Sequence, residues 1–239
     1  MEEKKSSGEF RELAEEFTGL EGNKVLNTLK GLTFRPGIVI SNHLKGGNRF
    51  LSPVIYFFAL LTIQFFVLSL TGFLDRVFEV QMARISEAFG GDESLEEDQV
   101  SRIVEQFGGF LTFIMSEIGQ KLVILPFSLA LIWLIYRGRK AGFKSHVWFG
   151  LYTFGHIILI STLLAFLWDA GISPDVIQYM TMIIAVFYWI FASGQFYQLS
   201  RWKAIGLGLL YYLLYFLFFS LVGGLFGIYI GFQLASDMG

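Results

Sequence analysis

Hydrophobic and charged residues are sharply separated along this chain of 239 residues. Four uncharged runs of 24 to 33 residues lie between charged segments, at residues 50–74, 145–168, 176–200 and 204–236. An α-helix crosses the ~30 Å hydrocarbon layer of a bilayer with about 20 residues. Each of these runs is therefore long enough to predict a transmembrane helix.

A fifth candidate span is shorter. The uncharged run between Lys121 and Arg137 has 15 residues, which make about 22 Å of helix. Extending the helix back to Phe113 includes Glu117, which lies one turn before Lys121, so the two charges can neutralise each other near the interface. We therefore predict five spans, at about residues 52–74, 113–136, 146–168, 176–199 and 204–232.

The charged segments between these spans alternate in sign. Residues 30–49, 137–146 and 201–203 carry Lys and Arg without acids, whereas residues 75–120 hold ten acids and three arginines. Lys and Arg are enriched in short loops on the cytoplasmic side of a membrane. With five spans all the basic segments fall on one side. The pattern thus predicts a cytoplasmic N-terminus and an external C-terminus.

The predicted fold class is all-α, a polytopic transmembrane helix bundle. Residues 51–239 would form the bundle, residues 75–112 an external helical loop, and residues 1–50 a cytoplasmic, interfacial region of amphipathic helices. Only 16% of the residues are charged, compared with about 25% in soluble domains. The chain is predicted to be a multi-pass protein of the cell membrane, namely the bacterial inner membrane, with the lipid bilayer as its main partner.

Composition also limits the chemistry. The net charge of −2 gives no general basic field for nucleic acid, so no nucleic-acid partner is expected. The chain has no cysteine, which excludes disulfides and cysteine-based zinc sites. His146 and His156 lie ten residues apart rather than at the one-turn spacing of a helical metal pair. We predict no metal site and no cofactor.

A basic stretch precedes the first predicted span. Pro36 favours the first turn of a short helix that ends near Leu44, and Arg35, Lys45 and Arg49 surround that helix in the sequence. One interpretation is anchoring to the anionic inner leaflet, where each cation contributes about 1 kcal/mol. The alternative is a lipid-headgroup or anion pocket, in which the backbone N–H groups of Gly46-Gly47 would approach the anion.

The same stretch contains an ordered set of residues ahead of the span: Thr28, Leu32, Arg35-Pro36-Gly37, Leu44-x-Gly46, Arg49-Phe50-Leu51 and Pro53. This order resembles the bacterial membrane-protein family known as domain of unknown function 3667. That family often carries an N-terminal four-cysteine zinc ribbon, which this chain lacks, and an acid before the histidine that corresponds to His146, where this chain has Ser145. In topology alone the chain also resembles the Yip family of five-span proteins. Neither resemblance implies a known reaction.

His156 is the one ionisable residue near the middle of a predicted span. Ionisable groups at that depth are candidates for a functional role. A neutral histidine can also hydrogen-bond a neighbouring helix, so both a proton or ligand path and a structural role are open.

Three glycines of the last predicted span, Gly223, Gly227 and Gly231, stand four residues apart. Small residues at this spacing allow two helices to approach closely in lipid. They predict helix packing, either within the bundle or between two copies of the chain as a homo-oligomer.

No catalytic motif stands out in the sequence. The spans contain no paired carboxylates and no nucleophile with a positioned base, which an intramembrane hydrolase requires, so no catalytic residue is named. The leading interpretation is a non-enzymatic membrane scaffold or regulator with an unidentified membrane protein partner. A small transporter or channel with a polar path near His156 is the alternative, and a membrane enzyme is third.

Overall fold

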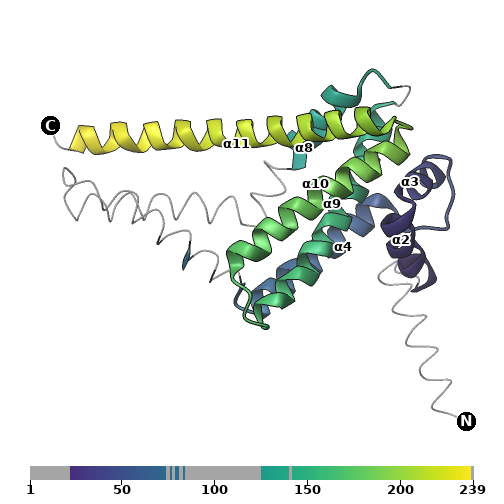
Figure 1. The fold of residues 1–239 in the computed structure, drawn as a ribbon, viewed down its shortest axis with the longest axis horizontal. Helices are drawn as coiled ribbons and strands as arrows, with labels where there is room; N and C mark the ends of the chain where they lie inside the picture. Colours follow the sequence, from purple (N-terminus) through teal and green to yellow (C-terminus); the bar gives the residue numbers. More distant parts are fainter. Residues whose placement is uncertain are drawn as a thin grey trace, which may run out of the picture.

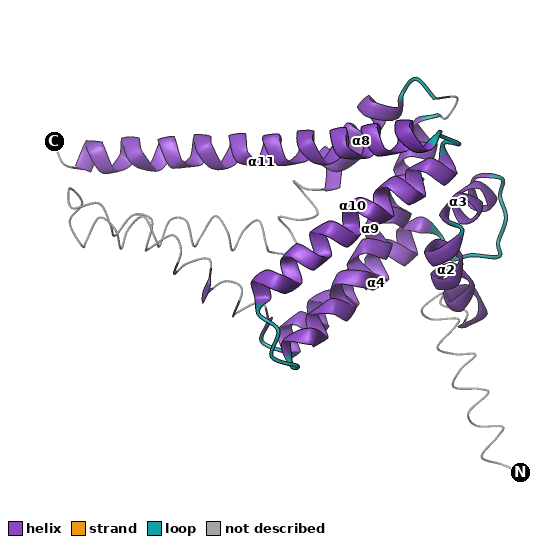
Figure 2. Ribbon diagram, in the orientation of Figure 1, coloured by secondary structure: helices purple, strands orange, loops and turns teal. Residues whose placement is uncertain are grey.

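The computed structural model of the protein describes residues 22–73, 76, 79, 80, 83, 125–139 and 142–237. Within these residues the chain forms helices and short connections, with no strand (Figure 2). The helices follow in the order α2 (Gly22–Phe34), α3 (Pro36–Leu44), α4 (Pro53–Leu70), α8 (Leu125–Tyr136), α9 (Phe143–Ala165), the 3-10 helix η2 (Phe166–Trp168), α10 (Pro174–Phe196) and α11 (Arg201–Asp237). The all-α prediction is confirmed.

Four helical segments of the described chain are long and apolar enough to cross a membrane: Pro53–Leu70, Phe143–Trp168, Pro174–Phe196 and Arg201–Leu225. They coincide with the first, third, fourth and fifth predicted spans. By length and composition, the chain is therefore an integral membrane protein.

The second predicted span, 113–136, is covered only in part. Helix α8 forms its second half as a 12-residue apolar helix, and its first half lies outside the described residues. The predicted external loop also lies outside them, apart from a few positions at its start, where Arg76 donates to Glu79 at 2.7 Å. Residues 1–21 of the predicted interfacial region lie outside them as well.

The starts of two helices follow from local sequence. Pro36 occupies the first turn of α3, and Arg35 before it has φ −144° and ψ 55°, outside helical geometry, as the proline predicts. Helix α4 begins at Pro53, and the side chain of Ser52 accepts a hydrogen bond from the N–H of Ile55 at 3.2 Å. That bond satisfies one of the free N–H groups of the first turn.

Helix α10 ends at Phe196, three residues earlier than the predicted span 176–199. The N–H of Leu199 bonds back to the carbonyl of Gly194 at 2.9 Å, and Gln198 between them has φ +52°. This turn closes the helix in the left-handed conformation that glycine usually supplies. A residue with a Cβ costs roughly 1–2 kcal/mol there.

Helices α4, α9 and α10 lie side by side, and α2 and α3 lie against the end of this bundle where α4 begins (Figure 1). Helix α9 is the centre of the arrangement, because it contacts α2, α3, α4, α8 and α10. Helix α11 contacts α10 and α8 and then runs away from the bundle (Figure 1). Its 37 residues make about 55 Å of helix, longer than the hydrocarbon layer.

Close approach between helices occurs at particular glycines. A Cβ on Gly155 of α9 would lie 2.9 Å from the ring of Tyr56 in α4, and one on Gly208 of α11 would lie 2.6 Å from Ile190 of α10. A Cβ on Gly223, by contrast, would meet no other helix of the described chain within 4 Å. Helix packing through Gly223, Gly227 and Gly231 therefore stays a prediction. The close helix contacts described above occur at Gly155 and Gly208 instead.

Candidate functional site

Charge is segregated between the two ends of the helix bundle. One end holds the starts of α4, α9 and α11 and the ends of α8 and α10, together with ten of the eleven described cations: Lys24, Lys30, Arg35, Lys45, Arg49, Arg137, Arg139, Lys144, Arg201 and Lys203. The described acids lie at the other end or at the tip of α11, at Glu79, Asp169, Asp175 and Asp237. We refer to the first as the cationic end.

The segment that joins α3 to α4 is fixed at the cationic end by side chains. The N–H of Leu51 donates to the hydroxyl of Thr28 in α2 at 2.9 Å, and the hydroxyl of Tyr152 in α9 donates to the carbonyl of Leu51. Thr28 and Tyr152 are fully buried. Buried backbone groups require such partners, so these bonds hold α2 and the connecting segment against α9.

The residues that carry the family resemblance meet in this same region. The hydroxyl of Tyr188 in α10 donates to the carbonyl of Leu32 at 3.0 Å. A Cβ on Gly37 would lie 2.9 Å from the backbone of Gln195, so only glycine lets α3 approach α10 this closely. The identities of Thr28 and Gly37 thus have structural reasons, and the side chain of Leu32 is fully buried.

His156 lies where α2, α4, α9 and α10 meet. Its Nδ1 is 2.9 Å from the hydroxyl of Tyr56 in α4, and its Nε2 is 3.2 Å from the hydroxyl of Thr33 in α2. Its ring lies 4.8 Å from that of Tyr188, centroid to centroid, and it is 2% exposed. Both ring nitrogens are therefore engaged with side chains of neighbouring helices.

Of the three predicted headgroup residues, the structure brings two together. Arg35 and Arg49 line a groove of about 620 Å³ between α2 and α3, and they are joined there by Lys30 and Asn27 of α2. We refer to this as the α2–α3 groove. The guanidinium of Arg49 also lies 5.6 Å from the centroid of the Phe50 ring, a distance at which a cation is attracted to the ring.

Lys30 was not among the sequence-predicted site residues. The sequence did contain a signal for Lys30: it lies one helical turn after Asn27, so the two residues share a face of α2. The use of that face depends on α3 folding back against α2. A Cβ on Gly31 would lie 2.5 Å from Val39 of α3, which shows how closely the two helices approach.

Lys45 lies in a different cavity, which we name the α3–α10 cleft. It has a volume of about 470 Å³ and is lined by Gly37, Ile38, Ser41, Asn42, Lys45, Gln195, Phe196 and Gln198. Only Ile38 lines both this cleft and the α2–α3 groove. The three cations grouped by sequence thus belong to two neighbouring sites.

The expectation that the N–H groups of Gly46-Gly47 approach an anion is wrong. The N–H of Gly46 bonds to the carbonyl of His43 at 3.0 Å, and that of Gly47 bonds to the carbonyl of Asn42 at 2.9 Å. Gly46 has φ +80°, a conformation that glycine adopts without strain. The pair closes the turn after α3, so its donors are used within the turn.

His43 borders the cationic end at an aromatic surface. Its ring meets those of Trp148 and Tyr152 edge to face, with centroids 5.8 and 6.1 Å away. Burial lowers the pKa of His43 below its ordinary value of 6.5, and the charge of Lys144 lowers it further. His43 is therefore neutral near pH 7, so it adds no positive charge to this end.

Comparison of the chain with protein-family models, with curated proteins and with solved structures finds no match. The resemblance to the domain of unknown function 3667 and to the Yip family stays a prediction from the sequence.

Proposed function

We propose that this protein is a non-enzymatic membrane scaffold or regulator that binds anionic lipid headgroups in the α2–α3 groove. The observation that carries the proposal is the gathering of Lys30, Arg35 and Arg49 around one groove. Among the residues that the structure describes, no carboxylate forms an ion pair with any of the three. Arginine in particular suits phosphate, because its planar guanidinium donates two parallel hydrogen bonds.

The headgroup layer is where such a groove would operate. Cations near an anionic leaflet contribute about 1 kcal/mol each. The bonds to Leu51 and Leu32 hold α2 and the connecting segment in place, so the groove would be preorganised rather than formed on binding.

Five spans, a cytoplasmic N-terminus, an external C-terminus and a bacterial inner-membrane location are part of this proposal. The clustering of ten described cations at one end of the bundle supports the orientation. Reporters of sidedness attached to both termini test it. Both reporters in the same compartment would contradict it.

Transport along a path through His156 is the less favoured function. A transport path needs polar groups that face a water-filled cavity. Instead, both ring nitrogens of His156 contact hydroxyls of packed helices. This supports a structural role in which His156 holds α2 to α4 and α9.

Lipid preference in nanodiscs tests headgroup binding. The full-length protein would be placed in discs of phosphatidylcholine with a minor fraction of dansyl-labelled phosphatidylglycerol, and energy transfer from its tryptophans would report local enrichment. We expect the triple variant Lys30→Gln/Arg35→Gln/Arg49→Gln to lose enrichment about fivefold.

A matched variant controls for total charge. Arg137→Gln/Arg201→Gln/Lys203→Gln removes three exposed cations from the same end outside the α2–α3 groove, and it should keep most of the enrichment. Equal losses in the two triple variants would mean general attraction to the anionic leaflet, and the proposal of a specific groove would fall.

A further inference from the structure

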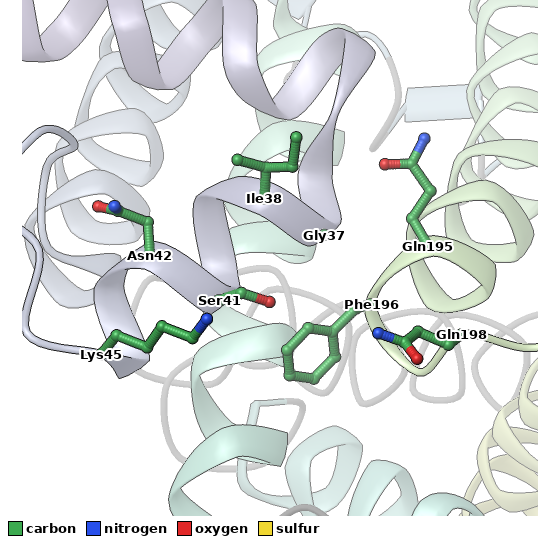
Figure 3. A pocket seen from close by; sticks show the side chains of 8 residues that line it. All are labelled: Gly37, Ile38, Ser41, Asn42, Lys45, Gln195, Phe196 and Gln198. Carbon is green, nitrogen blue, oxygen red and sulfur yellow. The ribbon is translucent and has the colours of Figure 1, made fainter.

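The α3–α10 cleft is a second polar cavity at the cationic end, separate from the α2–α3 groove. Its lining side chains come from α3 and from the end of α10. Figure 3 shows the Lys45 ammonium and the Ser41 hydroxyl on one side of the Phe196 ring, with the Gln198 amide on the other. Three side chains that can donate hydrogen bonds therefore lie around one aromatic ring.

The charge of the cleft favours an anion. Lysine offers three donors, serine one and the glutamine amide two. No carboxylate in the described part of the chain forms an ion pair with Lys45. An adjoining cavity of about 350 Å³ shares Phe196 and Gln198 and adds Arg139 and Ser145 to the lining. Lys45 lines one of these cavities and Arg139 the other, and Gln198 lines both.

Gln198 is the residue that the fold alone does not explain. It occupies the left-handed position of the turn that ends α10, with φ +52°, where glycine causes no strain. Gln198 lines both cavities. Residues held in a strained conformation are concentrated at functional sites, and here the side chain supplies what glycine would lack.

We propose that the α3–α10 cleft binds a phosphate ester group through Lys45, Ser41 and Gln198. The phosphate can belong to a lipid headgroup or be free in solution. The proposal goes beyond the headgroup binding assigned to the α2–α3 groove, because it depends on none of Lys30, Arg35 and Arg49.

Binding measurements on the full-length protein in phosphatidylcholine nanodiscs test this site. The probes are water-soluble dihexanoyl phosphatidylglycerol and inorganic phosphate, titrated separately. We expect saturable binding that Lys45→Gln weakens about tenfold and Gln198→Gly about fivefold. Binding of the lipid alone assigns the cleft to headgroups, whereas binding of both probes assigns it to the phosphate group itself.

Two controls separate binding from folding. Gln198→Gly relieves the left-handed strain, so it should melt at the same or a higher temperature while it binds less. Lys203→Gln removes an exposed cation of the same end that lines neither the α3–α10 cleft nor the adjoining cavity, and it should bind as the wild type does.

The outcome also distinguishes the two sites. The variant Lys30→Gln/Arg35→Gln/Arg49→Gln should lose lipid enrichment yet retain saturable binding within about twofold. Unchanged binding in Lys45→Gln or in Gln198→Gly, or no saturable binding of either probe, would overturn the proposal, even if the enrichment experiment succeeds.

Discussion

The contact between α4 and α9 and the far part of α11 are both apolar helix surfaces that contain glycine, yet they are built differently. At Gly155 a Cβ would come within 2.9 Å of Tyr56 and 3.3 Å of the backbone of Phe57. Around Gly223 there is open space among the described residues, and Leu221 beside it is 61% exposed. A glycine therefore marks a helix contact only where a second helix supplies the opposite surface.

Polar side chains make the same distinction. One turn of α9 brings His156 to Tyr56 and Thr33, and Tyr152 to Leu51. Hydrogen bonds between membrane helices are worth about 0.6 kcal/mol each on average, so several together fix which faces meet. The comparison teaches that α9 is held by directional contacts, whereas around Gly223 no other helix of the described chain supplies a facing surface.

The largest expected effect is the loss of the α4–α9 contact. Gly155→Leu places a side chain against Tyr56 and the backbone of Phe57, so it should destabilise the protein by about 3 kcal/mol or more. Gly223→Leu is the matched control and should stay within about 0.5 kcal/mol. Unfolding of both variants in the same detergent measures the difference. Similar losses would show that the comparison is wrong.

The second effect concerns the hydrogen bonds of His156. His156→Phe keeps a ring of similar size and removes both bonds, so we expect a loss of about 1–2 kcal/mol and faster proteolysis at α2. His156→Gln can restore one bond and should lose less. If His156→Phe is as stable as the wild type and protects α2 equally, the anchoring role is refuted.

A smaller effect tests what covers α11. If two copies associate through the glycines of the last span, Gly227→Leu should weaken self-association about fivefold, or roughly 1 kcal/mol. Sedimentation in a density-matched detergent measures the monomer fraction. An unchanged monomer fraction would end the homo-oligomer hypothesis for this surface.

The smallest effect is a change with pH. The pKa of His43 is lowered in the folded protein, so below about pH 6.5 the unfolded chain binds more protons than the folded one. The free energy of unfolding should therefore fall as the pH decreases below about 6.5. His43→Gln should flatten the slope of melting temperature against pH between about 5.5 and 7.5. An equal slope in both proteins would rule out His43 as the group that titrates.

The sequence by itself determined the solvent of this protein and the position of four helices. Apolar runs of this length are typical of membrane spans, and a helix is the structure that satisfies its own backbone in lipid. Pro36 and Pro53 set the starts of α3 and α4 in the same local way. The basic stretch before the first span also grouped Arg35, Lys45 and Arg49, of which Arg35 and Arg49 line one groove and Lys45 lines another cavity.

Only the tertiary structure decided which side chains meet. Local patterns do not reveal that Thr33 lies against His156, 123 positions later, or that Lys45 faces Gln198 rather than Arg35. Small-residue spacing directed attention to Gly223, Gly227 and Gly231, whereas the observed close approaches occur at Gly155 and Gly208. The reason is physical: lipid accepts any apolar helix face, so the choice of partner surface depends on shape and hydrogen bonding across helices, which are properties of two segments at once.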